Sequence, residues 1–411
     1  MKRSCAILFF ILCTATCLGQ KDQLNYYIGS GIANSPLLKD YQNQVQSTTY
    51  DSLLIRAAYR PQVTGNSLNS YAPVIKGYGY DAAITNGGNF NALVGVNKQV
   101  INKKLVAAQF QNLQFQDQSL KNSAKISEQE LKKNITAQYI TAYGDLQQMN
   151  FNKEINTLLL KEEIILKKLT QGNVYKQSDY LSFLVTLQQQ ELLMKQLDIQ
   201  YKNDIATLNY LSGIDDTSEV LLQDPRLSPG SLPDINGSVF LKQFEIDSLR
   251  FSNNKNLIAA AYRPKINLFA DAGFNSTLAY NPYKNFGTSF GISASIPIYD
   301  GKQKKLQYSK IDIAERTRIN YRDFFIKQYS QQVSQLRQQL KATEELIETI
   351  NKQLKYVESL ITVNEKLLET GEVHITDYIL ALNNYINAKN LVTQNTINRL
   401  QIINQINYWD R

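Results

Sequence analysis

Apolar residues alternate with small or polar residues along two segments in the second half of the chain. In 266–275 and 289–298 the even-numbered positions are apolar, and Phe269 is the large apolar residue on the odd-numbered side. This period of two predicts β-strands. A weaker alternation over 90–97, and the weakest strand over 71–82, predict a similar pair in the first half. Half-apolar strands of about ten residues are typical of transmembrane β-strands, and they also fit a soluble antiparallel hairpin.

Two long helices are predicted after the strand pairs. Residues 101–170 contain one glycine and no proline, and residues 302–370 contain neither. A helix of about 70 residues is roughly 100 Å long, so each of them must pack along other long helices. In the second helix, apolar residues three or four positions apart predict a coiled-coil seam, formed by Leu336, Leu340, Ile347, Ile350, Leu354, Val357, Leu360 and Ile361.

Each long helix ends in a similar passage, LTQGNVYKQSDYL in the first half and LETGEVHITDYIL in the second. We expect the glycine to end the long helix as a left-handed C-cap, and the aspartate to begin the returning helix as an N-cap. These residues are Gly172 and Asp179 in the first passage, and Gly371 and Asp377 in the second. The first passage has one more residue between glycine and aspartate. The returning helices are predicted over 179–212 and 377–409.

A nine-residue passage occurs twice, as IRAAYRPQV at 55–63 and as IAAAYRPKI at 258–266, with six identical residues. A helix-like segment of about 25 residues precedes each copy, and a strand is expected after it. Pro61 and Pro264 cannot continue a helix, and proline favours extended geometry in the residue before it. Each passage is therefore predicted to be a corner between a helix and a strand.

This duplication predicts a mainly α-helical chain built from two structural repeats. Each repeat contains a helix, two strands, a long helix, a turn and a returning helix. The first repeat covers 20–223 and the second 238–411, and the segment 224–237, which contains three prolines in DPRLSPGSLPD, links them. Two strands per repeat give four strands per chain. Four strands cannot remove their own open edges, so the pattern favours the assembly of several chains.

Composition narrows the possible classes of function. Residues 1–19 resemble a secretory signal peptide, with Lys2 and Arg3 before an apolar core. The alternative is a lipoprotein signal at Cys17. All three cysteines lie in this segment, so the exported protein is expected to lack thiol chemistry.

Basic and acidic residues are interspersed, which indicates a solvated helical surface and no nucleic-acid partner. His374 is the single histidine, and no catalytic, cofactor or metal site is predicted.

The order of these motifs resembles that of the TolC-like outer-membrane efflux proteins. The resemblance covers essentially the whole mature chain and is carried by the duplicated AAYRP corners, by IPIYDGKQKK at 296–305, and by the two glycine-to-aspartate passages. It implies a homotrimer in the outer membrane, with a twelve-stranded β-barrel continued by an α-helical tunnel. It also implies a periplasmic adaptor that docks near Gly172 and Gly371. Asp179 and Asp377 would lie near the pore mouth.

The function expected from this resemblance is a passive exit duct of a tripartite efflux or type I secretion system, energised by an inner-membrane pump. Some relatives carry an acidic residue one turn beyond the second aspartate, where this chain has Leu380. The alternative is a non-conducting periplasmic coiled-coil protein with a structural or adaptor role. An enzyme is not expected, because the residues offer no catalytic group to build on.

Overall fold

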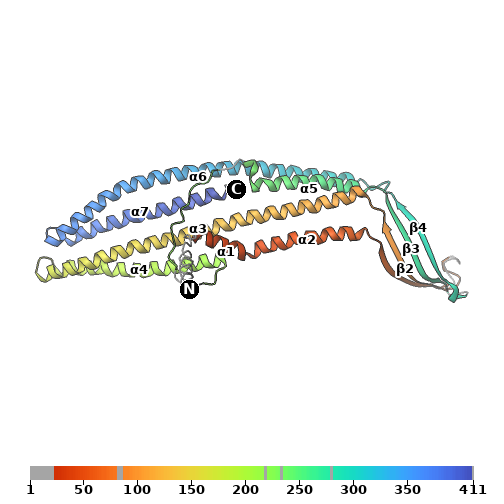
Figure 1. Ribbon diagram of the computed structural model, residues 1–411, viewed down its shortest axis with the longest axis horizontal. Coiled ribbons are helices and arrows are strands. Elements are labelled where there is room, and N and C mark those ends of the chain that lie inside the picture. Colours follow the sequence, from red (N-terminus) through yellow and green to blue (C-terminus); the bar gives the residue numbers. More distant parts are fainter. Residues whose placement is uncertain (1–22, 81–86, 217–219, 232–234, 278–280, 410–411) are drawn as a thin grey trace, which may run out of the picture. The chain divides into compact units, whose positions relative to one another are not determined.

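The computed structural model describes residues 23–80, 87–216, 220–231, 235–277 and 281–409. The predicted signal segment and its three cysteines lie outside these ranges. Helix α1 (Gln23–Asn34) comes first, and then the same order of elements occurs twice (Figure 1). The first series is α2 (Pro36–Ala58), β1 (Gln62–Ala72), β2 (Gly87–Gln99), α3 (Lys103–Gln171) and α4 (Gln177–Ser212). The second is α5 (Val239–Ala261), β3 (Lys265–Ser276), β4 (Phe286–Ser295), α6 (Gln303–Thr370) and α7 (Ile375–Tyr408). Short 3₁₀ turns occur at Ile235–Gly237 and Pro282–Lys284.

The positions of the helices and strands differ from the sequence-based prediction in three main places. The first strand is Gln62–Ala72 instead of 71–82, because it begins directly after the corner and is defined by its pairing with β2. Strand β4 ends at Ser295, just before the segment that contains Pro297, whose nitrogen cannot donate to a strand ladder. Helix α1 was not predicted. It contains two glycines, and Gly31 lets it approach Ile135 closely, since a Cβ there would lie 2.3 Å from the Ile135 Cδ1.

The chain forms two compact units. The sheet unit contains Asp40–Ser123 and Phe240–Phe324, and the helical unit contains Met1–Lys39, Ala124–Val239 and Phe325–Arg411. Each unit therefore takes segments from both predicted repeats. Helices α3 and α6 begin in the sheet unit and end in the helical unit. Within the described ranges, no helix combines the length and the apolar character needed to cross a membrane.

The sheet unit contains a four-stranded antiparallel sheet in the order β1-β2-β3-β4. Its register places apolar residues of all four strands on one face, because Ile292 pairs with Leu268, and Ala270 pairs with both Phe290 and Val96. Large side chains on this face are exposed, including Val63, Tyr71, Val94, Leu268, Phe286, Phe290 and Ile292. The opposite face carries mainly Asn, Ser, Thr, Asp and Gly. Phe269 is an exception there, and its ring lies over Gly291 of the paired strand.

The helical unit is held together by stripes of buried residues at coiled-coil spacing. Most of the predicted α6 seam is buried or half-buried, with Thr343 filling one further position. Leu360 does not belong to the seam: after Val357 the next buried position is Ile361, and Leu360 beside it is exposed. Hydrogen bonds attach the chain at the predicted linker to the helices. The Tyr139 hydroxyl donates to the Gln223 carbonyl, just before the linker, at 2.8 Å, and within the linker the Gly230 amide donates to Asn407 Oδ1 at 2.8 Å.

Candidate functional site at two paired turns

The first turn joins α3 to α4 and ends α3 with a left-handed residue. This residue is Asn173, at φ 60°, and not Gly172 as predicted. The Val174 amide donates to the Leu169 carbonyl at 2.9 Å, and the Asn173 amide donates to the Thr170 carbonyl at 3.1 Å. These two bonds satisfy carbonyl groups at the helix end in the manner of a Schellman motif. Asparagine accepts this conformation better than most residues with a side chain.

The second turn joins α6 to α7 and uses glycine at the equivalent place. Gly371 has φ 78°, as predicted, and the Glu372 amide donates to the Leu367 carbonyl at 2.9 Å. The structural counterpart of Gly371 is therefore Asn173. When these two residues are matched, the spacing to Asp179 and to Asp377 is the same. The extra residue noted in the sequence is thus only apparent.

The two aspartates are not N-caps, which corrects the prediction. The N-cap positions of α4 and α7 are occupied by Lys176 and His374, and neither side chain makes a capping hydrogen bond. Asp179 and Asp377 lie in the first turn of their helices. Carboxylates there still interact favourably with the positive end of the helix dipole. His374 is exposed, in agreement with the prediction of a surface position at the turn.

The two turns pack directly against each other. A Cβ at Gly371 would lie 2.7 Å from Val174 Cγ1, so glycine leaves room for the first turn. The Tyr175 hydroxyl lies 2.8 Å from the Val373 carbonyl and 3.1 Å from the Leu368 carbonyl. Tyr175 thus connects the first turn to the end of α6 and the backbone of the second turn. Sequence reasoning missed this role, because no local pattern shows which turn a tyrosine reaches.

A buried core lies directly behind the turns. It includes Leu159, Leu166 and Phe183 of the first hairpin, and Leu368 and Tyr378 of the second. One polar pair in this part of the unit is satisfied internally. The buried amide of Gln190 donates to Asn152 Oδ1 at 2.9 Å and to the Asn152 carbonyl at 3.1 Å.

A second polar group in this core is an acidic cluster on α3 and α6. Glu162 is completely buried, and its oxygens lie close to those of Glu365 and Glu369, all within 4.8 Å of one another. Lys161 Nζ lies 2.7 Å from Glu365 and 3.8 Å from each of the other two carboxylates. Burial, together with the charges of Glu365 and Glu369 and against the opposing charge of Lys161, raises the pKa of Glu162 to about 7.

The corner prolines lie in the sheet unit. Pro61 lies between the end of α2 and the start of β1, and Pro264 lies between the end of α5 and the start of β3. After the second strand pair, the Asp300 carboxylate accepts bonds from the Lys302 and Lys304 amides at 2.9 and 2.8 Å, and α6 begins at Gln303. Asn102 likewise accepts a hydrogen bond at the start of α3, where its Oδ1 accepts from the Leu105 amide.

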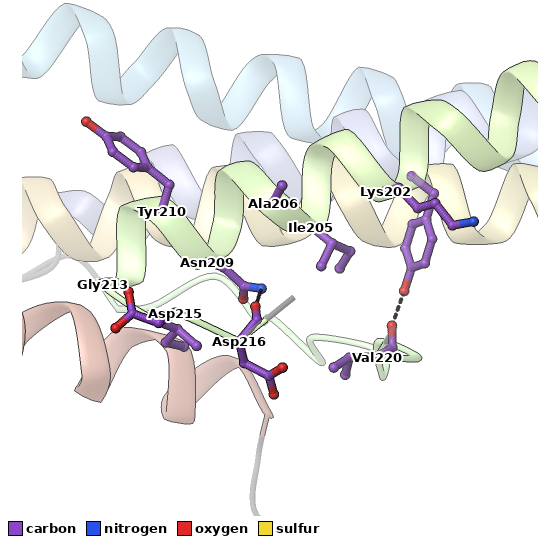
Figure 2. A pocket seen from close by; sticks show the side chains of 11 residues that line it. Lys202, Ile205, Ala206, Asn209, Tyr210, Gly213, Asp215, Asp216 and Val220 are labelled. Carbon is purple, nitrogen blue, oxygen red and sulfur yellow. Dashed lines mark hydrogen bonds between the residues drawn. The ribbon is translucent and has the colours of Figure 1, made fainter. Parts of the chain in front are cut away.

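A pocket of about 550 Å³ occurs at the C-terminal end of α4 (Figure 2). Gly213 ends α4, and the Asn209 side-chain amide donates to the Asp216 carbonyl at 2.6 Å. The Tyr201 hydroxyl donates to the Val220 carbonyl. These bonds attach Asp216 and Val220 to α4. The pocket wall is mainly apolar, and the residues predicted to be functional do not line it.

Comparison with solved structures identifies the fold. A membrane protein from Pseudomonas aeruginosa matches with a TM-score of 0.77 and 13% identity, over 94% of this chain and 90% of the other. CusC, a protein described as forming a transmembrane channel, matches with a TM-score of 0.75 and 14% identity, over 94% and 92%. The outer-membrane protein VceC from Vibrio cholerae matches with a TM-score of 0.74 and 11% identity, over 94% and 96%. The chain has the TolC-like fold.

This fold confirms the general architecture that the resemblance implied, a mainly helical chain with a small antiparallel sheet. At identities of 11–14%, the likeness establishes the fold and nothing further. No protein-family description matches the sequence, and no curated protein matches it.

Proposed function

We propose that this protein is an outer-membrane channel, the passive exit duct of a tripartite efflux or type I secretion system. The observation that carries the proposal is the sheet, with one exposed apolar face and one polar face. Phe290 is 89% exposed and Ile292 is 72% exposed, although both lie in a regular strand between small residues. If the sheet were part of a closed barrel, lipid would contact the apolar face on the outside and water would contact the polar face on the inside. Solved channels with this fold, such as the outer-membrane channels CmeC and MtrE, support the proposal.

The open edges of the sheet favour a trimer. Within the described residues, β1 and β4 each pair on one side only. Unpaired backbone groups are very costly in lipid, so a spanning sheet must close. Three chains would close a twelve-stranded barrel. Exposed apolar residues on the helices, such as Leu181, Val185 and Leu192 on α4, would then be covered by neighbouring chains in an α-helical tunnel.

The paired turns are the proposed periplasmic end of this tunnel. Gly172 and Gly371 would lie where a periplasmic adaptor docks, linking the duct to an inner-membrane pump. Asp179 and Asp377 would lie near the pore mouth and would favour cations there. Gly172 has exposed backbone, and a Cβ added there would meet no atom closer than 3.5 Å, so a partner helix could approach this turn.

The experiment that tests this function uses the purified full-length protein in detergent. Chemical crosslinking is expected to give a trimer, and addition to planar lipid bilayers is expected to give discrete single-channel currents. A stable monomer in buffer without detergent, with no currents in bilayers, would contradict the proposal. That result would favour the alternative, a non-conducting periplasmic coiled-coil protein.

A further inference from the structure

Glu162 occupies a position in α3 where the coiled-coil pattern calls for an apolar residue. It lies in the buried stripe between Leu159 and Leu166 and is itself fully buried. Neither of its carboxylate oxygens has a hydrogen-bond partner among the residues that the structure describes. The Lys161 ammonium group, 3.8 Å away, compensates this buried carboxylate only in part, and an incompletely compensated buried charge is destabilising. The Asn152–Gln190 pair, in contrast, is a buried polar pair of this core that is satisfied internally.

A second group, on a third helix, is also unsatisfied. Tyr378 of α7 is completely buried, and in the described part of the chain its hydroxyl has no hydrogen-bond partner. Tyr378 belongs to the same buried core as Leu166 and Leu368, and burial together with the charges of Glu162 and Glu365 raises the pKa of its hydroxyl. Its counterpart in the other hairpin, Tyr180, donates to Glu163 at 2.5 Å. The position that corresponds to Glu163 before the second turn is Ile361, so Tyr378 lacks that partner in its own hairpin.

We propose that Glu162, Glu365 and Glu369 form a binding site for a divalent cation of the Ca²⁺ class, with the Tyr378 hydroxyl beside it. Two oxygens on one Ca²⁺ at 2.3–2.6 Å can be at most about 5 Å apart, and the three carboxylates lie within 4.8 Å of one another. Carboxylate and hydroxyl oxygens are the hard ligands that Ca²⁺ selects. The cation would tie α3 to α6 just before the two turns.

Lys161 is the present counter-charge and would compete with the cation. Its ammonium group contacts all three carboxylates, but its side chain is 56% exposed and can leave the cluster without disturbing the core. With Lys161 in place the cluster still has an excess of two negative charges when all its carboxylates are ionised. A divalent ion would balance that excess. This site does not depend on whether the protein conducts.

The test is Ca²⁺ binding to the full-length protein in detergent, after chelator treatment, by equilibrium dialysis. We expect one Ca²⁺ per chain, with a Kd on the order of 10⁻⁴ M. Glu162→Gln and Glu369→Gln should each weaken binding about tenfold or more. Glu369 is partly exposed, so Glu369→Gln is expected to leave the fold intact, and an unchanged melting temperature would show that a loss of binding is not due to unfolding. Glu348→Gln, an exposed glutamate on the same helix, is the matched control and should bind as the parent does.

Lys161→Met separates a cation site from a purely structural ion pair. If the cluster binds Ca²⁺, removing the competing ammonium group should tighten binding several-fold. A structural ion pair predicts only a lower melting temperature for this variant, with no calcium effect. The proposal would be overturned if the parent bound no Ca²⁺ at millimolar concentrations, if Glu162→Gln bound as well as the parent, or if Lys161→Met failed to bind more tightly.

Discussion

A left-handed residue ends each long helix, but the two turns use different side chains for it. Gly371 is at φ 78°, and the equivalent first-turn residue is Asn173 at φ 60°. A non-glycine residue in this region costs about 1–2 kcal/mol. Gly371 has the further constraint of Val174, which a Cβ would meet at 2.7 Å. The two glycines that look alike in the sequence therefore have different physical roles.

Alanine substitutions distinguish these roles. Gly371→Ala should lower the free energy of unfolding by about 1–2 kcal/mol, because the left-handed conformation penalises a Cβ. Gly172→Ala should be neutral or slightly stabilising, because Gly172 has ordinary backbone angles and a Cβ there has room. Thermal melting of the detergent-solubilised protein measures both. Equal destabilisation by the two substitutions would contradict the assignment of Asn173 as the left-handed residue.

A carboxyl pair between α3 and α4 makes stability depend on pH. Burial, a hydrogen bond with Asp204 and the charge of Asp204 together raise the pKa of Asp145 to about 7, and burial is the largest cause. Folding therefore favours the protonated form of Asp145. Its contribution to stability is complete below pH about 4, near the pKa of an unfolded aspartate, and is lost as the pH rises through about 7.

We expect Asp145→Asn to flatten this dependence between pH 4 and pH 7. The neutral amide has no proton to lose, so the variant should lose less stability over this range than the parent. Urea unfolding at pH 5 and pH 8 gives the comparison. Asp198→Asn, an exposed aspartate on α4, is the control and should keep the parental slope. An unchanged slope in Asp145→Asn would show that this carboxyl does not control the effect.

At the scale of elements, the sequence predicted most of the helices and three of the four strands. Long proline-free segments leave few alternatives to helix, and the alternation in β3 and β4 is strong. The first strand was misplaced because QVTGNSLNSYA is mostly polar, and only its register with β2 identifies its apolar face. The site was less predictable. Contacts such as Tyr175 with the second turn depend on how two hairpins meet, although Glu162 was visible as a charge within an apolar stripe.

The two faces of β4 give a direct test of the sheet's environment. Ile292 lies on the apolar face opposite Leu268, and Ser293 lies on the polar face opposite Asn267. Ile292→Lys should block membrane insertion or cost about 2–4 kcal/mol near the bilayer midplane. Ser293→Lys should be tolerated because its side chain would meet water. Folding into lipid vesicles measures both variants, and equal tolerance would contradict the proposed lipid face or its register.

At the scale of the whole molecule, the proposed docking of a partner at the paired turns can be tested with a substitution there. The substitution must block the partner without unfolding the protein. The structure shows which residue suits this experiment. A large side chain at Gly371 would strain the left-handed turn and collide with Val174. Gly172 is exposed, has ordinary backbone angles, and has no neighbouring atom closer than 3.5 Å to an added Cβ. A bulky residue at Gly172 would therefore extend into the space that a partner needs.

Gly172→Trp should leave the trimer, its membrane location and its melting temperature unchanged, while transport is lost. The measurement is the accumulation of a fluorescent dye in cells that lack the native gene and carry either the parent or the variant. Gly172→Ala is the matched control and should restore export, because a methyl group is too small to exclude a partner helix. Normal export by Gly172→Trp would show that partners do not dock at this turn. If Gly172→Trp cells fail to export but purified Gly172→Trp gives the parental currents in planar bilayers, the defect lies in docking and not in the pore.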